Sequence, residues 1–234
     1  MRPFLLLILL CATMQGNAQT IFLQPEVGLG ITSVHVKNSV GITPQSTNVM
    51  AYQYQITVGK SSGRVVWGAG ISFLRTGYEN SLSSYYSGLP TAYSKYYWYY
   101  YHLTFPFYAG YRFDIGKKMK ITPTIGPEIS YNLYATAQEI GTSTVQHIDN
   151  FKEGYDQFSI FGSVRLNAEF SVSKKISIVI SPEALYMLTN FYKTPGNITG
   201  TATQRNSAYL VNAGIKWNLI KRAKHPATGD KTGK

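Results

Sequence analysis

A strict two-residue alternation of apolar and polar side chains, repeated eight times along the chain, constrains this sequence more than any other feature. It is clearest between residues 99 and 113. One face of this stretch consists of Tyr99, Tyr101, Leu103, Phe105, Phe107, Ala109, Tyr111 and Phe113, and the other of Tyr100, His102, Thr104, Pro106, Tyr108, Gly110, Arg112 and Asp114. Because successive side chains of a β-strand point to opposite faces, the pattern predicts a strand with one apolar and one polar face.

The alternation predicts eight strands in all. They lie near residues 22–34, 51–60, 64–78, 99–113, 120–137, 158–171, 175–188 and 209–219. The connections are alternately long, near residues 35–50, 79–96, 138–157 and 189–206, and short, at 61–63, 116–119 and 173–174. Long and short connections therefore lie at opposite ends of the strands. This plan is typical of outer-membrane barrels, and we predict an all-β fold, an eight-stranded antiparallel up-and-down transmembrane β-barrel.

The composition of the polar face indicates which face meets lipid. A soluble, lipocalin-like carrier would have its apolar face inside and an outer face rich in Lys and Glu. Here the polar face is mostly small or uncharged, and it includes Gly28, Gly30, Gly68, Gly70, Gly110, Gly126 and Gly214. The apolar face carries no charge in its central span, and Arg75 near one rim is the nearest exception. We therefore expect the apolar face to point outward into a membrane.

Aromatic residues are expected to form two girdles on the apolar face, as in other membrane barrels. The girdle near the short turns would contain Trp67, Tyr111, Phe113 and Trp217, and the girdle near the long loops Tyr52, Tyr54, Tyr99, Tyr101, Tyr186 and Tyr209.

The two ends of the chain differ from the alternating region. A signal peptide cleaved after Ala18 is predicted by Arg2, the apolar stretch from Pro3 to Thr13 and the small residues Gly16 and Ala18. The only cysteine, Cys11, lies within residues 1–18, so the mature chain would form no disulfide. We expect the barrel domain at residues 19–220 and a basic periplasmic tail at residues 221–234. The expected location is the outer membrane of a Gram-negative bacterium.

Charged residues on the polar face predict an ionic network inside the barrel. Pro-Glu pairs recur at positions 25–26, 127–128 and 182–183, each with the glutamate on the inner face. The predicted network consists of Glu26, Arg112, Asp114, Glu128, Arg165, Glu169, Glu183 and Lys216. Buried ions must pair, since an isolated one is costly. Two roles remain open, an ion-pair network that plugs the barrel and a selectivity element or proton path.

Two segments resemble a known family. The stretch LTFPFYAGYRF from Leu103 to Phe113, together with GPEI from Gly126 to Ile129, is similar to the outer-membrane β-barrel family that includes porin-family and PorT-like proteins. The resemblance extends over nearly the whole mature chain. It implies the barrel fold and, because some PorT-like relatives take part in a protein-secretion apparatus, a role with secretion-machinery partners. It carries over no functional residue.

The sequence contains no enzyme motif. No G-x-S-x-G motif occurs, and the four histidines do not have the spacing of metal ligands. We therefore expect no catalytic residue, no cofactor and no metal site. A lipid-modifying enzyme remains an alternative, with His102, the histidine in a strand interior, as its candidate base. A narrow passive porin-like channel is the other alternative, although an eight-stranded barrel has little interior space.

The net charge of +11 raises the question of nucleic-acid binding. Twelve of the 22 Lys and Arg residues, however, fall at the short turns or in the tail. That end would face the periplasm, so the expected partners are outer-membrane lipids with anionic headgroups or an acidic periplasmic protein, and no nucleic acid. The preferred function is that of a non-enzymatic component acting through its loops or tail, as an anchor, adhesion surface or secretion-complex subunit.

Overall fold

A computed structural model describes residues 19–37, 46–86, 89–139, 145–147, 156–190 and 203–222. The predicted signal peptide and most of the predicted tail lie outside these residues. Eight long strands make up the fold. They are β1 (Gln19–Lys37), β3 (Val49–Ser62), β4 (Val65–Tyr86), β5 (Leu89–Tyr111), β7 (Met119–Glu139), β9 (Phe158–Ser171), β10 (Ile176–Met187) and β11 (Thr203–Arg222). Among the described residues, no helix is long and apolar enough to cross a membrane.

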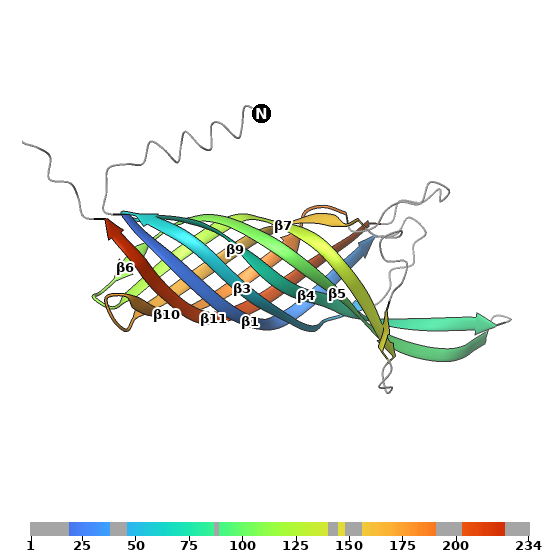
Figure 1. The fold of residues 1–234 in the computed structure, drawn as a ribbon. Coiled ribbons are helices and arrows are strands. Elements are labelled where there is room, and N and C mark those ends of the chain that lie inside the picture. The colour runs from blue at the N-terminus through green and yellow to red at the C-terminus, as the bar shows by residue number, and fades with distance from the viewer. Residues whose placement is uncertain are drawn as a thin grey trace, which may run out of the picture.

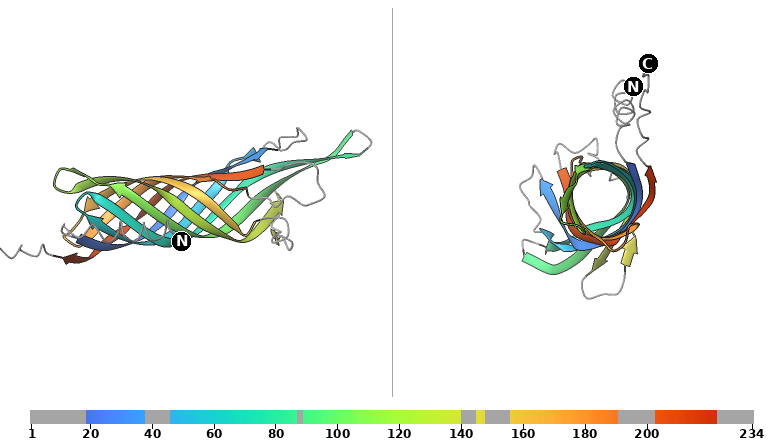
Figure 2. Two further views of the ribbon diagram at one scale, coloured as in Figure 1. Left: turned by 90° about the horizontal axis from the view of Figure 1, so that it is seen from above. Right: turned by 90° about the vertical axis from the view of Figure 1, so that its left-hand side faces the viewer.

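The eight strands close into a barrel (Figures 1 and 2). Every neighbouring pair is antiparallel, β1 pairs with both β3 and β11, and the pairing of β4 with β5 completes the ring. Tracing the paired residues once around the barrel from Gly30 in β1 leads back to β1 at Thr20, ten residues away. This offset requires the strands to tilt against the barrel axis, as Figure 1 shows. The predicted fold class is confirmed.

Tight turns lie at one end of the barrel. The turn between β3 and β4 contains Gly63, and the turn before β7 contains Gly116, with φ angles of 60° and 68° that favour glycine. The short strand β6 (Phe113–Ile115) pairs with the start of β7 beside this second turn. β1 begins and β11 ends at the same end (Figure 1).

The opposite end differs from the prediction, because residues 79–96 do not form a long loop. β4 continues to Tyr86 and β5 begins at Leu89, so the two strands form a hairpin that projects beyond the barrel (Figure 1). Two short strands flank its base. They are β2 (Ser46–Thr47), which pairs with β4, and β8 (Val145–His147), which pairs with β7. The sequence signal was obscured because this segment is rich in Tyr and Ser and lacks the alternation of the barrel strands.

Burial along the strands is inverted relative to a soluble protein. The outward positions are apolar and exposed, for example Leu29 at 63% and Ile125 at 67%. The inward positions are mostly polar and buried, including Gln53, Thr104, Ser130 and Asn212, each at 1% or less. Apolar side chains therefore face the membrane and polar side chains fill the barrel interior, as the alternating pattern predicts.

Two interior glycines are required by close backbone approach. A Cβ atom on Gly30 would lie 1.8 Å from the carbonyl oxygen of Tyr209, and one on Gly126 would lie 1.7 Å from that of Phe107. At these positions only glycine lets the neighbouring strands approach so closely. The inward positions that are not glycine carry the side chains that fill the barrel.

Candidate functional site

The centre of the barrel interior is organised by one arginine. Arg165, on β9, is 6% exposed, and its Nη1 lies 2.7 Å from Oε2 of Glu26 on β1. Its Nη2 lies 2.6 Å from Oε2 of Glu183 on β10 and donates to Oε1 of Gln55 on β3 at 2.9 Å. One guanidinium thus joins four strands across the interior, which its planar set of donors makes possible.

Neutral donors complete the coordination of the two paired carboxylates. Ser163 donates to Oε1 of Glu183 at 2.7 Å, and Asn212 donates to Oε2 of the same carboxylate at 2.8 Å. Ser181 lies within hydrogen-bond distance of Oε1 of Glu26, at 3.1 Å. Charge-assisted hydrogen bonds of this kind offset the cost of removing both carboxylates from water.

Glu128 occupies the same region without a cation of its own. It is 1% exposed, and its Oε2 accepts a hydrogen bond from Thr104 at 3.2 Å. Its Oε1 has no hydrogen-bond partner among the described residues. The Glu128 side chain lines a cavity of about 10 Å³ together with Glu183 and Arg165. A volume of this size holds roughly one water molecule, so Glu128 adds a carboxyl group to the packed centre and opens no passage there.

A second ionic cluster lies closer to the short turns. Glu169 on β9 accepts from Lys216 at 2.7 Å and from Ser177 at 2.9 Å, and Nζ of Lys120 lies 3.4 Å from its Oε1. The ammonium group of Lys216 also lies 4.1 Å from the ring centre of Phe22. Lys120 is one of the twelve basic residues that the sequence places at the short turns or in the tail. Its inward position at the start of β7 lets its long side chain reach Glu169.

Two residues of the predicted network lie apart from these clusters. Arg112 pairs with Asp114 at 3.4 Å, and the Asp114 side chain is 45% exposed. The pair lies where β5 ends and β6 begins, beside a short turn. The structure therefore brings together Glu26, Arg165 and Glu183, places Glu128 beside them, joins Glu169 to Lys216, and leaves Arg112 with Asp114 at the rim.

The other half of the interior contains a neutral hydrogen-bonded chain around His102. The His102 ring is fully buried, with Nδ1 2.5 Å from Oδ1 of Asn132 and Nε2 2.9 Å from Oγ1 of Thr76. Because an amide oxygen only accepts, Nδ1 carries the proton, and in the neutral ring Nε2 then accepts from the Thr76 hydroxyl. Asn206 then donates to Oγ1 of Thr76 at 3.2 Å, and Asn132 donates to the carbonyl of Asp156 at 2.5 Å. The assignment gives each of these groups a consistent partner.

The arrangement of Thr76, His102 and Asn132 has the order of a nucleophile, a base and an orienting group. All three side chains are at most 1% exposed. A hydrolase needs its nucleophile in contact with substrate, and burial denies the Thr76 hydroxyl that contact. The chemistry that this arrangement supports is cross-linking of strands by hydrogen bonds.

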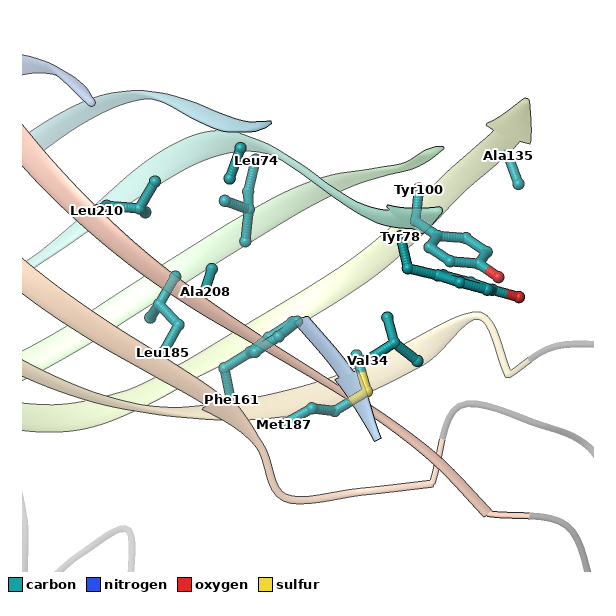
Figure 3. Packing of buried hydrophobic residues seen from close by; sticks show 11 residues of the cluster. Val34, Leu74, Tyr78, Tyr100, Ala135, Phe161, Leu185, Met187, Ala208 and Leu210 are labelled. Carbon is teal, nitrogen blue, oxygen red and sulfur yellow. The ribbon is translucent and has the colours of Figure 1, made fainter. Parts of the chain in front are cut away.

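An apolar cluster fills the interior near the base of the projecting hairpin (Figure 3). It consists of Val34, Ala51, Leu74, Tyr78, Tyr100, Ala135, Phe161, Leu185, Met187, Ala208 and Leu210. Several of its members come from inward positions near the strand ends, on β1, β4, β9 and β10. The alternating pattern predicts a polar interior, and this cluster corrects that prediction. Its signal was weak because each strand contributes only one or two apolar residues to the polar face.

Within the described ranges, no group of three or more His, Cys, Asp or Glu side chains is arranged to hold a metal ion. A further small cavity, lined by Glu169 and Lys216 among others, is also about 10 Å³. The described interior is therefore a packed set of side chains.

Aromatic side chains gather on the outward face near the long-connection end. Tyr101 stacks on Tyr134 with ring centres 4.4 Å apart. The ring centre of Tyr52 lies 5.7 Å from that of Tyr54 and 6.3 Å from that of Phe73. At the other end Tyr111 contacts Phe113 at 5.1 Å. Such belts mark the two membrane–water interfaces of a barrel.

The sequence matches the family described as outer membrane protein beta-barrel domain over residues 4–219. The chain belongs to this family. It is therefore a transmembrane barrel of the outer membrane. In barrels of this plan the short turns generally face the periplasm. The narrower resemblance to porin-family and PorT-like proteins stays a prediction.

The chain is similar in structure to several solved outer-membrane proteins. A major outer membrane protein from Thermus thermophilus is 10% identical, with 85% of this chain and 99% of that chain covered and a TM-score of 0.49. Neisserial surface protein A is 16% identical, with 85% and 97% covered and a TM-score of 0.45. Ail, the attachment invasion locus protein of Yersinia pestis, is 10% identical, with 86% and 99% covered and a TM-score of 0.39. No curated protein matches the chain.

Proposed function

We propose that this protein is a non-enzymatic outer-membrane component that acts through its extracellular surface, as an adhesion surface, an anchor or a subunit of a secretion complex. The observation that carries the proposal is the hairpin of β4 and β5. Among the described residues, 81–86 and 89–95 pair only with each other, beyond the last pairs that β2 makes with β4 and β7 makes with β5.

The projecting hairpin suits a binding role for a physical reason. Each of its two strands has one edge paired within the hairpin and one edge whose backbone groups face outward. Such edges add a further strand from another polypeptide readily, and proteins usually cover or shorten them. An extended segment of a partner protein is the ligand that this backbone geometry fits.

The packed interior supports the same proposal. Transport through an eight-stranded barrel requires a continuous water path, and the Arg165 cluster, the His102 chain and the apolar cluster each occupy the interior. The buried position of Thr76 and His102 gives no support to lipid chemistry.

The periplasmic end contributes a second contact surface. The exposed residues of its short turns include Arg64, Lys117, Lys118, Lys174 and Lys175. Clustered cations at a membrane surface attract anionic headgroups or an acidic protein partner. Binding of the purified protein to vesicles containing phosphatidylglycerol should weaken at high salt if headgroups are the partner, and unchanged binding would exclude them.

Site-specific cross-linking tests the role of the hairpin. A photoreactive residue at Ser84 or Ala92 in the native membrane should give a reproducible adduct that mass spectrometry identifies. The matched control places the same residue at Ile180, which faces outward on β10. A variant with residues 82–93 replaced by Asn-Gly should fold, as a heat-dependent gel shift reports, and should not co-purify the same partner. Equal adducts from position 180 and from the hairpin would contradict the proposal.

A further inference from the structure

Arg75 is an unusual charge on the outward face of the barrel. It lies on β4, four residues from Ile71, whose side chain is 47% exposed on the same face. The Arg75 guanidinium carbon lies 4.3 Å from the ring centre of Tyr52 on β3 and 4.5 Å from that of Tyr99 on β5. The guanidinium is therefore held between two aromatic rings from neighbouring strands.

The charge of Arg75 has no counter-ion in the described part of the chain. Its Nη2 donates to the carbonyl of Met50 at 3.1 Å. Glu79, the next carboxylate along β4, pairs instead with Lys95 at 3.4 Å. A guanidinium that is fixed by two rings and one carbonyl retains donors for an external anion.

The location of Arg75 indicates the kind of anion. The tyrosines around it belong to the girdle at the extracellular end, and such girdles lie at the level of lipid headgroups. Lipid phosphate groups lie at that depth, and the fork of N–H groups on a guanidinium matches phosphate oxygens in pairs. A charge at this position is costly in a membrane unless such a partner is present.

Arg75, Tyr52 and Tyr99 together form a cage on the outward face. An apolar groove begins beside this cage and runs toward the middle of the barrel wall. Its volume is about 600 Å³, and its lining includes Tyr54, Ile56, Ile71, Phe73, Ala213 and Ile215. Tyr54 and Phe73 both contact the Tyr52 ring, so groove and cage are continuous. The small side chain of Ala213 helps to leave the depression open.

We propose that Arg75, Tyr52 and Tyr99 bind a phosphate group of an outer-leaflet lipid, with an acyl chain of the same lipid in the adjoining groove. The two features are matched, because the polar cage lies toward the extracellular rim and the groove toward the membrane centre. The inference rests on membership in the outer-membrane family and is independent of the proposed role of the hairpin.

Native mass spectrometry of the whole purified barrel in detergent tests the site. The probes are phosphatidic acid and phosphatidylcholine with identical acyl chains, because only the first exposes a phosphate monoester. The wild-type protein should retain phosphatidic acid in preference to phosphatidylcholine. Arg75→Gln should weaken the first by about tenfold, the scale of one charge-assisted hydrogen bond. The matched control is Arg205→Gln, which alters an exposed arginine of β11 near the same end and should leave binding unchanged.

Two further variants separate the parts of the site. Tyr52→Leu keeps the charge but removes one wall of the cage, and it should weaken phosphatidic acid binding less than Arg75→Gln does. Ala213→Phe fills the groove, and it should weaken binding of long-chain lipid while leaving a short-chain phosphatidic acid unaffected. Both changes lie on the outward face and spare the interior.

The outcomes distinguish the sources of phosphate. Excess inorganic phosphate should not displace the lipid, since it cannot use the groove. Displacement by inorganic phosphate, or equal losses in Arg75→Gln and Arg205→Gln, would overturn the proposal. So would equal retention of phosphatidylcholine and phosphatidic acid by the wild-type protein.

Discussion

The two halves of the barrel interior are filled in different ways. Toward the periplasmic turns the interior contains ion pairs, with Glu169 held by Lys216 and the Arg165 cluster at the centre. Toward the extracellular end it contains the neutral chain of His102 and the apolar cluster around Leu185 and Phe161. The interior of an eight-stranded barrel can therefore be filled both by paired charges and by close apolar packing. The two halves should therefore respond differently to substitution.

The largest effect is expected in the charged half. Arg165→Met removes one cation and leaves Glu26 and Glu183 buried without it. The free energy of unfolding should fall by about 3–5 kcal/mol, the cost of breaking a buried ion pair from one side. Urea unfolding in lipid vesicles, followed by tryptophan fluorescence, measures this change.

A combined variant is the control for that substitution. Replacing Glu26 and Glu183 by Gln in the Arg165→Met background removes all three charges together, and much of the lost stability should return. If the combined variant is as unstable as the single one, packing rather than charge holds the centre together.

A smaller loss is expected from the apolar half. Leu185→Ala opens a cavity within the cluster of Figure 3, where Leu185 is 1% exposed. The free energy of unfolding should fall by about 3 kcal/mol, within the range for buried leucines. Ile180→Ala, at an outward position of the same strand, is the control and should cost less, because lipid chains can fill the space that the removed side chain leaves. Equal losses at the two positions would mean that the cluster is no more tightly packed than the lipid-facing wall.

His102 is expected to contribute less, and only to stability. His102→Ala leaves Thr76 and Asn132 without their ring partner, which should lower the free energy of unfolding by about 2 kcal/mol. Any hydrolysis of a fluorescent phospholipid by the purified protein should be the same before and after the substitution. A loss of hydrolysis in the folded variant would instead identify His102 as a base.

The smallest effect is expected at Glu128. Glu128→Gln keeps the shape of a carboxyl group that forms no ion pair with the described residues, and stability should change by less than about 1 kcal/mol. Glu183→Gln, which weakens contacts with Arg165 and Asn212, should cost more, about 2 kcal/mol. The same unfolding measurement compares them, and a reversed order would show that the carboxylates have been assigned the wrong partners.

The fold could be predicted from sequence because the two-residue period is a local signal. Alternation between residues 99 and 113 determines which side chains face outward, and the structure follows it. The projecting hairpin was missed because its pairing does not require one buried and one exposed face. The register of one strand on the next could not be predicted either. It sets the offset of ten residues at which the barrel closes, and alternation within one strand carries no information about it.

The interior contacts show a similar division. Inward positions for Glu26, Arg165 and Glu183 follow from alternation, but their meeting across the barrel depends on strand tilt. Gln55, Asn132 and Thr76 were not singled out, because uncharged polar residues are frequent on the inner face and carry no distinguishing signal. The contact of Lys120 with Glu169 could not be predicted, because the reach of a long side chain at a strand end cannot be read from the pattern.

The most direct test of the account is single-channel recording of the refolded protein in planar lipid bilayers. Folding is first verified by the heat-dependent gel shift. A barrel sealed by the Arg165 cluster and the apolar cluster should insert without producing steady conductance steps. Reproducible ohmic steps from the folded wild-type protein would show that a continuous water path runs through the interior, and would contradict the account.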